Sequence, residues 1–248
     1  MSTDPSIIEQ QEPPRSFWSR WAGVYFSPSE TYWDIARKPN FISPLIVAIV
    51  AGLVLTEAVL FKIGAGRIIR NAIEQSAQGS QMTGEQIDQA VQKGSTIVTV
   101  IAHVNALVGT PIFLLIIAGL GLAFVNVIYG EQMNFKTSFS VACYTNLIFV
   151  VGIVMALAII FFGDAESFNA NNPMPTNPGF FLNPLETSKP LLAIASSLDL
   201  ISFWFIALLG IGYSAASGGK VKAFSISALF FGCWLVVVLI KVGIALIS

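Results

Sequence analysis

The chain has 248 residues, of which 54% are hydrophobic and only 11% are charged, whereas about a quarter are charged in an average soluble domain. These charges are too few to cover the surface of a soluble protein of this length. The composition therefore predicts an integral membrane protein that crosses the bilayer several times. The formal net charge of −1 offers no basic surface for nucleic acid, and the two cysteines are too few for a disulfide framework.

The N-terminal 40 residues are predicted to lie outside the bilayer. Residues 1–14 are polar and rich in proline, which predicts a disordered tail, and they lack an apolar signal-peptide core, so the first span would direct its own insertion. Residues 15–40 are amphipathic and predict an interfacial segment with aromatic membrane anchors at Trp18, Trp21, Tyr32 and Trp33. A capping box from Ser27 to Glu30 predicts a short helix. This helix either lies in the membrane interface or packs on the bundle as an ordinary surface helix.

The remaining residues, 41–248, are predicted to form one all-α integral membrane domain. Five long apolar runs predict a five-span transmembrane helical bundle. The spans are expected at about 41–61, 96–129, 138–162, 191–214 and 223–247. The second run is longer than one crossing requires, and Pro111 within it predicts a kink.

Two of the connections between spans are long. The segment from Ile63 to Ser95 is polar but keeps a helical pattern, and Thr83 and Gln86 form a capping box within it, so it predicts a helical hairpin outside the bilayer. The segment between the third and fourth spans is rich in asparagine and proline, which predicts a long exposed loop. Lysine and arginine are enriched beside the first span and in the two short loops, which predicts a cytoplasmic N-terminus and an external C-terminus.

Four ionisable residues lie inside the predicted spans, and together they form an intramembrane polar layer: Glu57, His103, Asp199 and Lys241. When the spans are threaded alternately, all four fall about 8–12 Å below the same membrane face. Ionisable groups inside a bilayer usually face the bundle interior and form pairs. By depth and sign, we expect Glu57 to pair with Lys241, and Asp199 to bind His103 or Asn105.

This polar layer has three open interpretations. It is a structural clasp that fixes the order of the helices, or it is a pathway for protons or ions, because an acid pair with a histidine and a lysine is also what a relay needs. In the third interpretation, His103 is an axial ligand for haem or a pigment, although no second ligand is evident. Motifs with the spacing of a nucleophile elbow, a zinc site or a phosphate loop are absent from the sequence, so no enzymatic activity, metal or cofactor is predicted.

Three ordered segments resemble one known family. They are YFSPSETYWDIARKPN (25–40), SFSVACYTNLIFVVGIV (138–154) and LDLISFWFIALLGIGYSAASGGKVKAF (198–224). Together they resemble the YIP family, the Ypt/Rab-interacting membrane proteins, in its prokaryotic-type branch. Asp199 and Trp204 are positions of the family pattern.

The resemblance implies a helical protein with five spans and a cytoplasmic N-terminus, located in a prokaryotic inner membrane. It further implies a scaffold without enzymatic activity, because eukaryotic members resemble scaffolds for small GTPases and membrane proteins. The acidic motif that precedes the first span in those members is replaced here by FSPSE, which counts against a small GTPase as partner.

The expected function is that of a scaffold or accessory subunit in a membrane complex. The expected partners are the lipid bilayer and either another integral membrane protein or a second copy of the chain. Two alternatives stay open: a small ion- or proton-coupled transporter or channel that uses the polar layer, and a subunit of a cofactor or pigment complex with His103 as the ligand.

Overall fold

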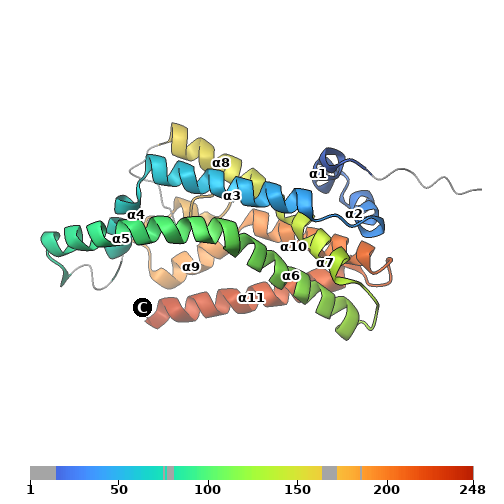
Figure 1. Ribbon diagram of the computed structural model, residues 1–248. Coiled ribbons are helices and arrows are strands. Elements are labelled where there is room, and N and C mark those ends of the chain that lie inside the picture. Colours follow the sequence, from blue (N-terminus) through green and yellow to red (C-terminus); the bar gives the residue numbers. More distant parts are fainter. Residues whose placement is uncertain (1–14, 75, 77–80, 164–171, 185, 248) are drawn as a thin grey trace, which may run out of the picture.

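The protein is an all-α bundle of long helices (Figure 1). The computed structural model describes residues 15–247 except 75, 77–80, 164–171 and 185. Within these residues every regular element is helical, so the all-α prediction is confirmed. The predicted disordered tail, 1–14, lies outside the described residues, as does most of the predicted turn of the hairpin.

Five segments are long and apolar enough to cross a membrane, if one bent pair of helices counts as a single span. They are α3 (Ile42–Lys62), the run of α5 (Gly84–Val104), η2 (Asn105–Gly109), α6 (Thr110–Ala123) and η3 (Phe124–Ile128), then α7 (Phe135–Asn146) with α8 (Phe149–Phe162), the bent pair α9 (Lys189–Ser197) and α10 (Leu200–Ala216), and α11 (Ala223–Ile247). Their positions agree with the predicted spans, except that the second helical run begins at Gly84, well before the expected membrane entry.

The second run changes direction between α5 and α6 (Figure 1). Pro111 lies in the first turn of α6, directly after the π-helical segment η2. Proline has no backbone N–H and its ring crowds the preceding turn, so the regular α-helical bonding is interrupted there. The predicted kink is confirmed.

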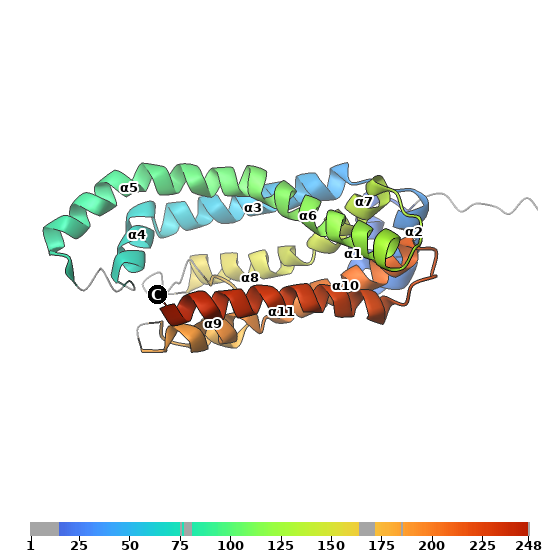
Figure 2. The same cartoon turned by 90° about the horizontal axis from the view of Figure 1, so that it is seen from below.

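The spans form two layers that one helix joins. Figure 2 shows α3, α5 and α6 in one layer and α9, α10 and α11 in the other. Helix α7 contacts both α6 and α10, and every residue from Thr137 to Thr145 is buried. The core of the bundle is therefore built around α7, at the end where the two layers meet.

A buried tyrosine fills the centre of this core. The side chain of Tyr213 is fully buried, and its ring stacks on Phe230 with 5.6 Å between the ring centroids. Its hydroxyl group lies 3.2 Å from the backbone oxygen of Ser138 on α7. A Cβ added at Gly121 on α6 would lie 2.0 Å from Tyr213 Cζ, so glycine is required where α6 passes over the ring.

The two N-terminal helices, α1 (Phe17–Phe26) and α2 (Pro28–Arg37), pack on the bundle. Tyr32 and Ile35 of α2 are fully buried, and the Tyr32 hydroxyl lies 2.6 Å from Thr145 Oγ1 on α7. Of the two expectations for α2, packing on the bundle is therefore confirmed. The prediction that Tyr32 anchors the chain in lipid is wrong, because α7 and α10 cover its ring. Ser27 precedes the helix but makes no side-chain capping bond.

The polar segment after α3 forms the predicted helical hairpin. Helix α4 (Ala65–Glu74) packs against α5, and an ion pair of 2.6 Å joins Arg70 to Asp88. Gly64 turns the chain between α3 and α4 with a φ of 84°, a value that few other residues adopt. The capping box at Thr83 and Gln86 is present with both of its hydrogen bonds.

In its described residues, the segment that follows α8 is not the exposed loop that its composition predicts. Its described part, 172–182, includes the short helix η4 (Pro178–Phe181) and packs against the bundle. Asn177 is buried, and an added Cβ at Gly179 would lie 2.6 Å from the backbone nitrogen of Ser196. The exposed-loop prediction is wrong here because hydrogen bonds to the broken fourth span hold the segment in place.

Candidate functional site

Asp199 lies where the fourth span is broken. Helices α9 and α10 meet at an angle of 45°, and Asp199 is the N-cap of α10. Its carboxylate accepts bonds from the backbone nitrogen and the hydroxyl of Ser202, at 2.8 and 2.6 Å, and from the hydroxyl of Thr176. The Leu200 N–H donates to the Thr176 carbonyl at 3.0 Å. Asp199 therefore fastens the preceding segment to the break. The prediction that it binds His103 or Asn105 is wrong.

Glu57 pairs with His103 rather than with Lys241. Glu57 Oε1 lies 2.7 Å from His103 Nε2, and His103 Nδ1 lies 2.7 Å from the Thr99 carbonyl oxygen one turn earlier. Lys241 is exposed on α11, and no ion pair to it occurs within the described residues. The contact agrees with the expectation that Glu57 and His103 lie at one level along their helices, but level alone does not say which sides of the helices face each other.

The hydrogen bonds of His103 fix the charge of the pair. A carbonyl oxygen only accepts, so Nδ1 carries a proton that it donates to Thr99. The contact between Nε2 and Glu57 Oε1 holds one further proton, which resides on either the imidazole or the carboxyl group. Both arrangements have zero net charge. A neutral pair is far less costly in a bilayer than a separated acid and base.

The Glu57–His103 pair lies on an outer surface of the bundle. The Glu57 side chain is 65% exposed and that of His103 is 34% exposed. The apolar residues around the pair are also exposed, and together with it they define the α3–α5 face: Val50, Val54, Phe61, Val100 and Val104. A hydrocarbon surface offers no hydrogen bonds to the remaining carboxyl oxygen of Glu57, so lipid is a poor neighbour for this face.

The four ionisable residues do not form one connected relay. Glu57 and His103 face outward from α3 and α5, whereas Asp199 binds Thr176 and Ser202 at the break between α9 and α10. Lys241 is exposed on α11 in the other layer (Figure 2). Both ring nitrogens of His103 are engaged in hydrogen bonds, so neither presents a free lone pair to the iron or magnesium of a cofactor. The geometry suits a structural role for two parts of the layer: Glu57 and His103 form a hydrogen-bonded pair, and Asp199 caps α10.

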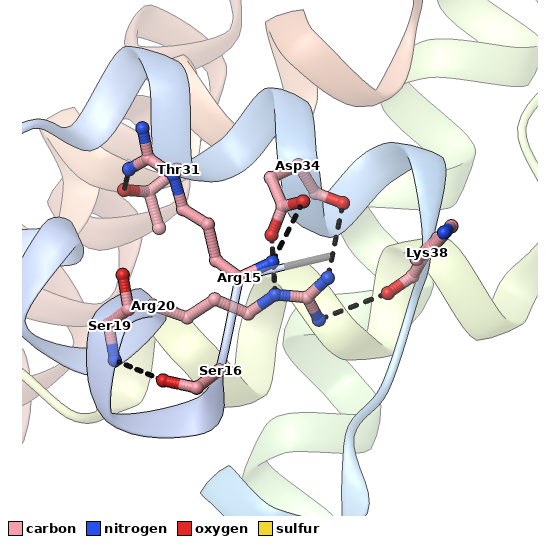
Figure 3. Close-up of polar contacts among 7 residues, drawn as sticks. All are labelled: Arg15, Ser16, Ser19, Arg20, Thr31, Asp34 and Lys38. Atoms are coloured by element: carbon pink, nitrogen blue, oxygen red, sulfur yellow. Dashed lines mark hydrogen bonds and ion pairs between the residues drawn. The ribbon is translucent and has the colours of Figure 1, made fainter. Parts of the chain in front are cut away.

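A buried ionic cluster fastens the N-terminal helices to each other (Figure 3). Arg20 on α1 is 4% exposed, and its Nε lies 2.6 Å from Asp34 Oδ2 on α2. The same guanidinium group donates to the Lys38 carbonyl at 3.0 Å and lies 5.9 Å from the ring centroid of Tyr144. Arg15 binds the more exposed Glu30 at 2.8 Å. This cluster is not apparent from the sequence, because its arginines have the spacing expected for the polar side of an amphipathic segment.

Helix α1 also covers the break in the third span. At the turn between α7 and α8, the Leu147 carbonyl accepts a bond of 3.0 Å from the Val150 N–H and a second bond of 2.6 Å from the Tyr25 hydroxyl. Tyr25 in turn accepts a bond of 3.0 Å from Trp21 Nε1, and its ring packs edge-on against Trp204 at 6.1 Å. Burial raises the pKa of the Tyr25 hydroxyl, so this group stays protonated as a donor. The family-pattern residue Trp204 therefore contacts the N-terminal segment.

The four predicted membrane anchors have different surroundings. Tyr32 is buried. Trp21 is half-buried, and its Nε1–H donates a hydrogen bond to the Tyr25 hydroxyl. Trp18 is 67% exposed and stacks on Trp21 at 5.3 Å, whereas Trp33 is 39% exposed. An interfacial role stays a prediction for Trp18 and Trp33.

Comparison with known proteins agrees with the sequence resemblance. A family model described as the Yip1 domain matches residues 22–241. The match begins within α1, after Arg20. It covers all of α2, both broken spans and the Glu57–His103 pair. No curated protein sequence and no solved structure matches the chain. With most of its length matched, the chain belongs to the Yip1-domain family of multipass membrane proteins.

Proposed function

We propose that this protein is a non-enzymatic scaffold or accessory subunit of a membrane complex, and that the α3–α5 face contacts another transmembrane chain. The observation that carries the proposal is the exposed Glu57–His103 pair within the apolar surface of two spans. A partner helix with a hydroxyl or amide side chain would satisfy the free carboxyl oxygen of Glu57, which hydrocarbon cannot do. The partner is another integral membrane protein or a second copy of the chain.

We assign the end of the bundle that carries α1 and α2 to the cytoplasm of a prokaryotic cell. The two short loops lie at this same end (Figure 1). An ion pair of 2.6 Å between Lys220 and Glu131 joins them. Lysine in short loops beside the spans favours retention of those loops on the cytoplasmic side. With five spans, the C-terminus is then external.

Photocrosslinking from two matched valines tests the scaffold proposal. A photoreactive amino acid replaces Val54 on the α3–α5 face or, as the control, Val236 on α11; the two side chains are 48% and 55% exposed. Irradiation of native membranes is expected to give one protein adduct of defined mass from position 54 and only lipid adducts from position 236. Because Glu57 supplies the polar contact, Glu57→Leu is expected to lower the yield at position 54 severalfold.

Two results would contradict the proposal. Equal protein adducts from both positions would mean random collision in the membrane, and lipid adducts alone from position 54 would mean that lipid covers the α3–α5 face. An adduct with twice the mass of the chain identifies a second copy as the partner.

A further inference from the structure

An open groove runs between the two layers, on the opposite side of α3 and α5 from the Glu57–His103 pair. It encloses about 660 Å³ and is lined by α3, by the run from α5 to α6, and by α8. On α3 the lining extends from Ala48 to Leu60, which is about 18 Å at 1.5 Å per residue. Met174, from the segment after α8, also lines the groove, and a Cβ added at Gly152 would lie 2.5 Å from its sulfur. The groove lies within membrane-spanning segments and is long enough for a hydrocarbon chain.

The groove contains polar groups but no charged ones. Its walls are mostly aliphatic and aromatic, and its polar lining side chains are Thr56, Asn105, Thr110 and Asn146. Within the described residues, none of these four side chains has a hydrogen-bond partner in the protein, and none of their polar atoms is fully buried without a partner. Polar side chains at this depth need hydrogen bonds that hydrocarbon does not provide. A few converging polar groups in an apolar concave surface are typical of a ligand site.

Irregular helical geometry places these groups. Asn105 begins the π-helical segment η2, and its Oδ1 would lie 2.2 Å from a Cβ added at Gly109, so glycine makes room for the amide. Gly52 on α3 lies beside Thr110, whose Oγ1 would be in ordinary contact, 4.0 Å, with an added Cβ. Asn146 is the last residue of α7 before its break. Isolated π-helical turns within α-helices occur frequently at functional sites.

We infer that this groove binds a neutral lipid. Its chain would lie along the apolar walls, and its ester or hydroxyl oxygens would bond to the two asparagine amides and the two threonine hydroxyls. The lining offers no lysine or arginine to a phosphate group, so a charged headgroup would be unpaired at this depth. A lipid of the diacylglycerol type satisfies both requirements. The inference does not depend on the scaffold proposal, because the groove and the α3–α5 face lie on different sides of the same helices.

Photolabelling of the full chain in phosphatidylcholine nanodiscs tests the inference. The probe is a diacylglycerol with a diazirine in one acyl chain, and adducts are mapped by peptide mass spectrometry. Unlabelled diacylglycerol and phosphatidic acid with the same acyl chains serve as competitors. Ala102→Leu fills the groove from a half-buried position, and Thr110→Val removes one hydroxyl group while keeping the side-chain shape.

Matched controls come from the same helical run, the one from α5 to α6. Val104→Leu enlarges a side chain that faces away from the groove, and Thr99→Val removes a hydroxyl that bonds to the Ser95 carbonyl and does not line the groove. Thermal unfolding of each variant in nanodiscs shows that it folds. If Ala102→Leu fails to fold, Thr110→Val still gives an independent result.

The inference predicts adducts on the peptides that contain residues 48–60 and 98–110. Unlabelled diacylglycerol should displace the probe at a concentration at least about tenfold lower than the concentration of phosphatidic acid that has the same effect. Ala102→Leu should abolish this labelling, and Thr110→Val should weaken the apparent affinity about fivefold, as expected for one neutral hydrogen bond. Equal competition by phosphatidic acid, or labelling that Ala102→Leu leaves unchanged, would overturn the inference.

Discussion

At the scale of residues, two similar ion pairs contribute differently to stability, because they are exposed to water to different extents. The side chains of Arg20 and Asp34 are 5% and 20% exposed, whereas those of Arg15 and Glu30 are 34% and 72% exposed. A buried ion that loses its partner keeps its desolvation cost, but an exposed one is solvated again. Of the two pairs, only the buried one is expected to fix the position of α1 on α2.

Arg20→Met is therefore expected to lower the free energy of unfolding by about 3 kcal/mol, because it leaves the Asp34 carboxylate without its partner. Arg15→Met, a change of the same type on the same segment, is expected to cost less than about 1 kcal/mol. Denaturant titration of both variants in the same detergent checks the difference. Equal losses would show that the cluster in Figure 3 does not hold the two helices together.

At the scale of elements, the sequence predicts where the helices are better than where they break. The spans were predictable because an apolar run of about 20 residues has few stable alternatives to a membrane helix. The breaks after Asn146 and before Asp199 lie inside segments that are apolar on average, so mean hydropathy does not reveal them. Tertiary contacts stabilise both breaks: the Tyr25 hydroxyl binds the Leu147 carbonyl at the first, and the Thr176 hydroxyl binds Asp199 at the second.

The candidate site was only partly predictable for a related reason. Position along a span gives the depth of a residue, so Glu57 and His103 were correctly placed at one level. Rotation of each helix about its axis decides which side chains meet, and helices that are apolar all around leave this rotation unspecified. Of the polar groups in the groove, Asn105 is expected from the sequence only as an alternative partner of Asp199, and Asn146 is not expected as a site residue, because both side chains are uncharged.

The role of Asp199 can be tested with two substitutions. Asp199→Ala removes the N-cap of α10 and the bond to Thr176, and is expected to destabilise the protein by about 1–2 kcal/mol. Asp199→Asn can still cap the helix with its amide oxygen and donate its N–H to the Thr176 hydroxyl. Hydrogen exchange across 172–182 is expected to accelerate in the alanine variant and to stay near the parent rate in the asparagine variant. Acceleration in neither variant would mean that other contacts hold the segment.

At the scale of the whole molecule, the bundle has two chemically distinct ends. One end carries α1, α2 and the two short loops, and the other carries the α4–α5 hairpin (Figure 2). The same chain thus places a compact, ionically fastened unit at one membrane surface and a long helical projection at the other.

The orientation of these ends is testable with single cysteines, after replacement of Cys143 and Cys233. Phe181, which is 75% exposed, lies in the segment after α8, and Lys222 lies in the short loop before α11. A membrane-impermeant thiol reagent added to intact cells is expected to label cysteine at position 181 but not at position 222. Permeabilised cells should label both. The reverse pattern in intact cells would place the N-terminus outside.

The bond from Tyr25 to the Leu147 carbonyl joins residues 122 positions apart, and it has a consequence for biogenesis. Helices α1 and α2 are synthesised before α7 and α10, so their binding surface does not exist until the third and fourth spans have been synthesised and inserted. Until then the nascent N-terminal segment has its aromatic side chains uncovered at the membrane surface. The N-terminal segment can therefore dock only after the fourth span has been inserted, long after its own synthesis.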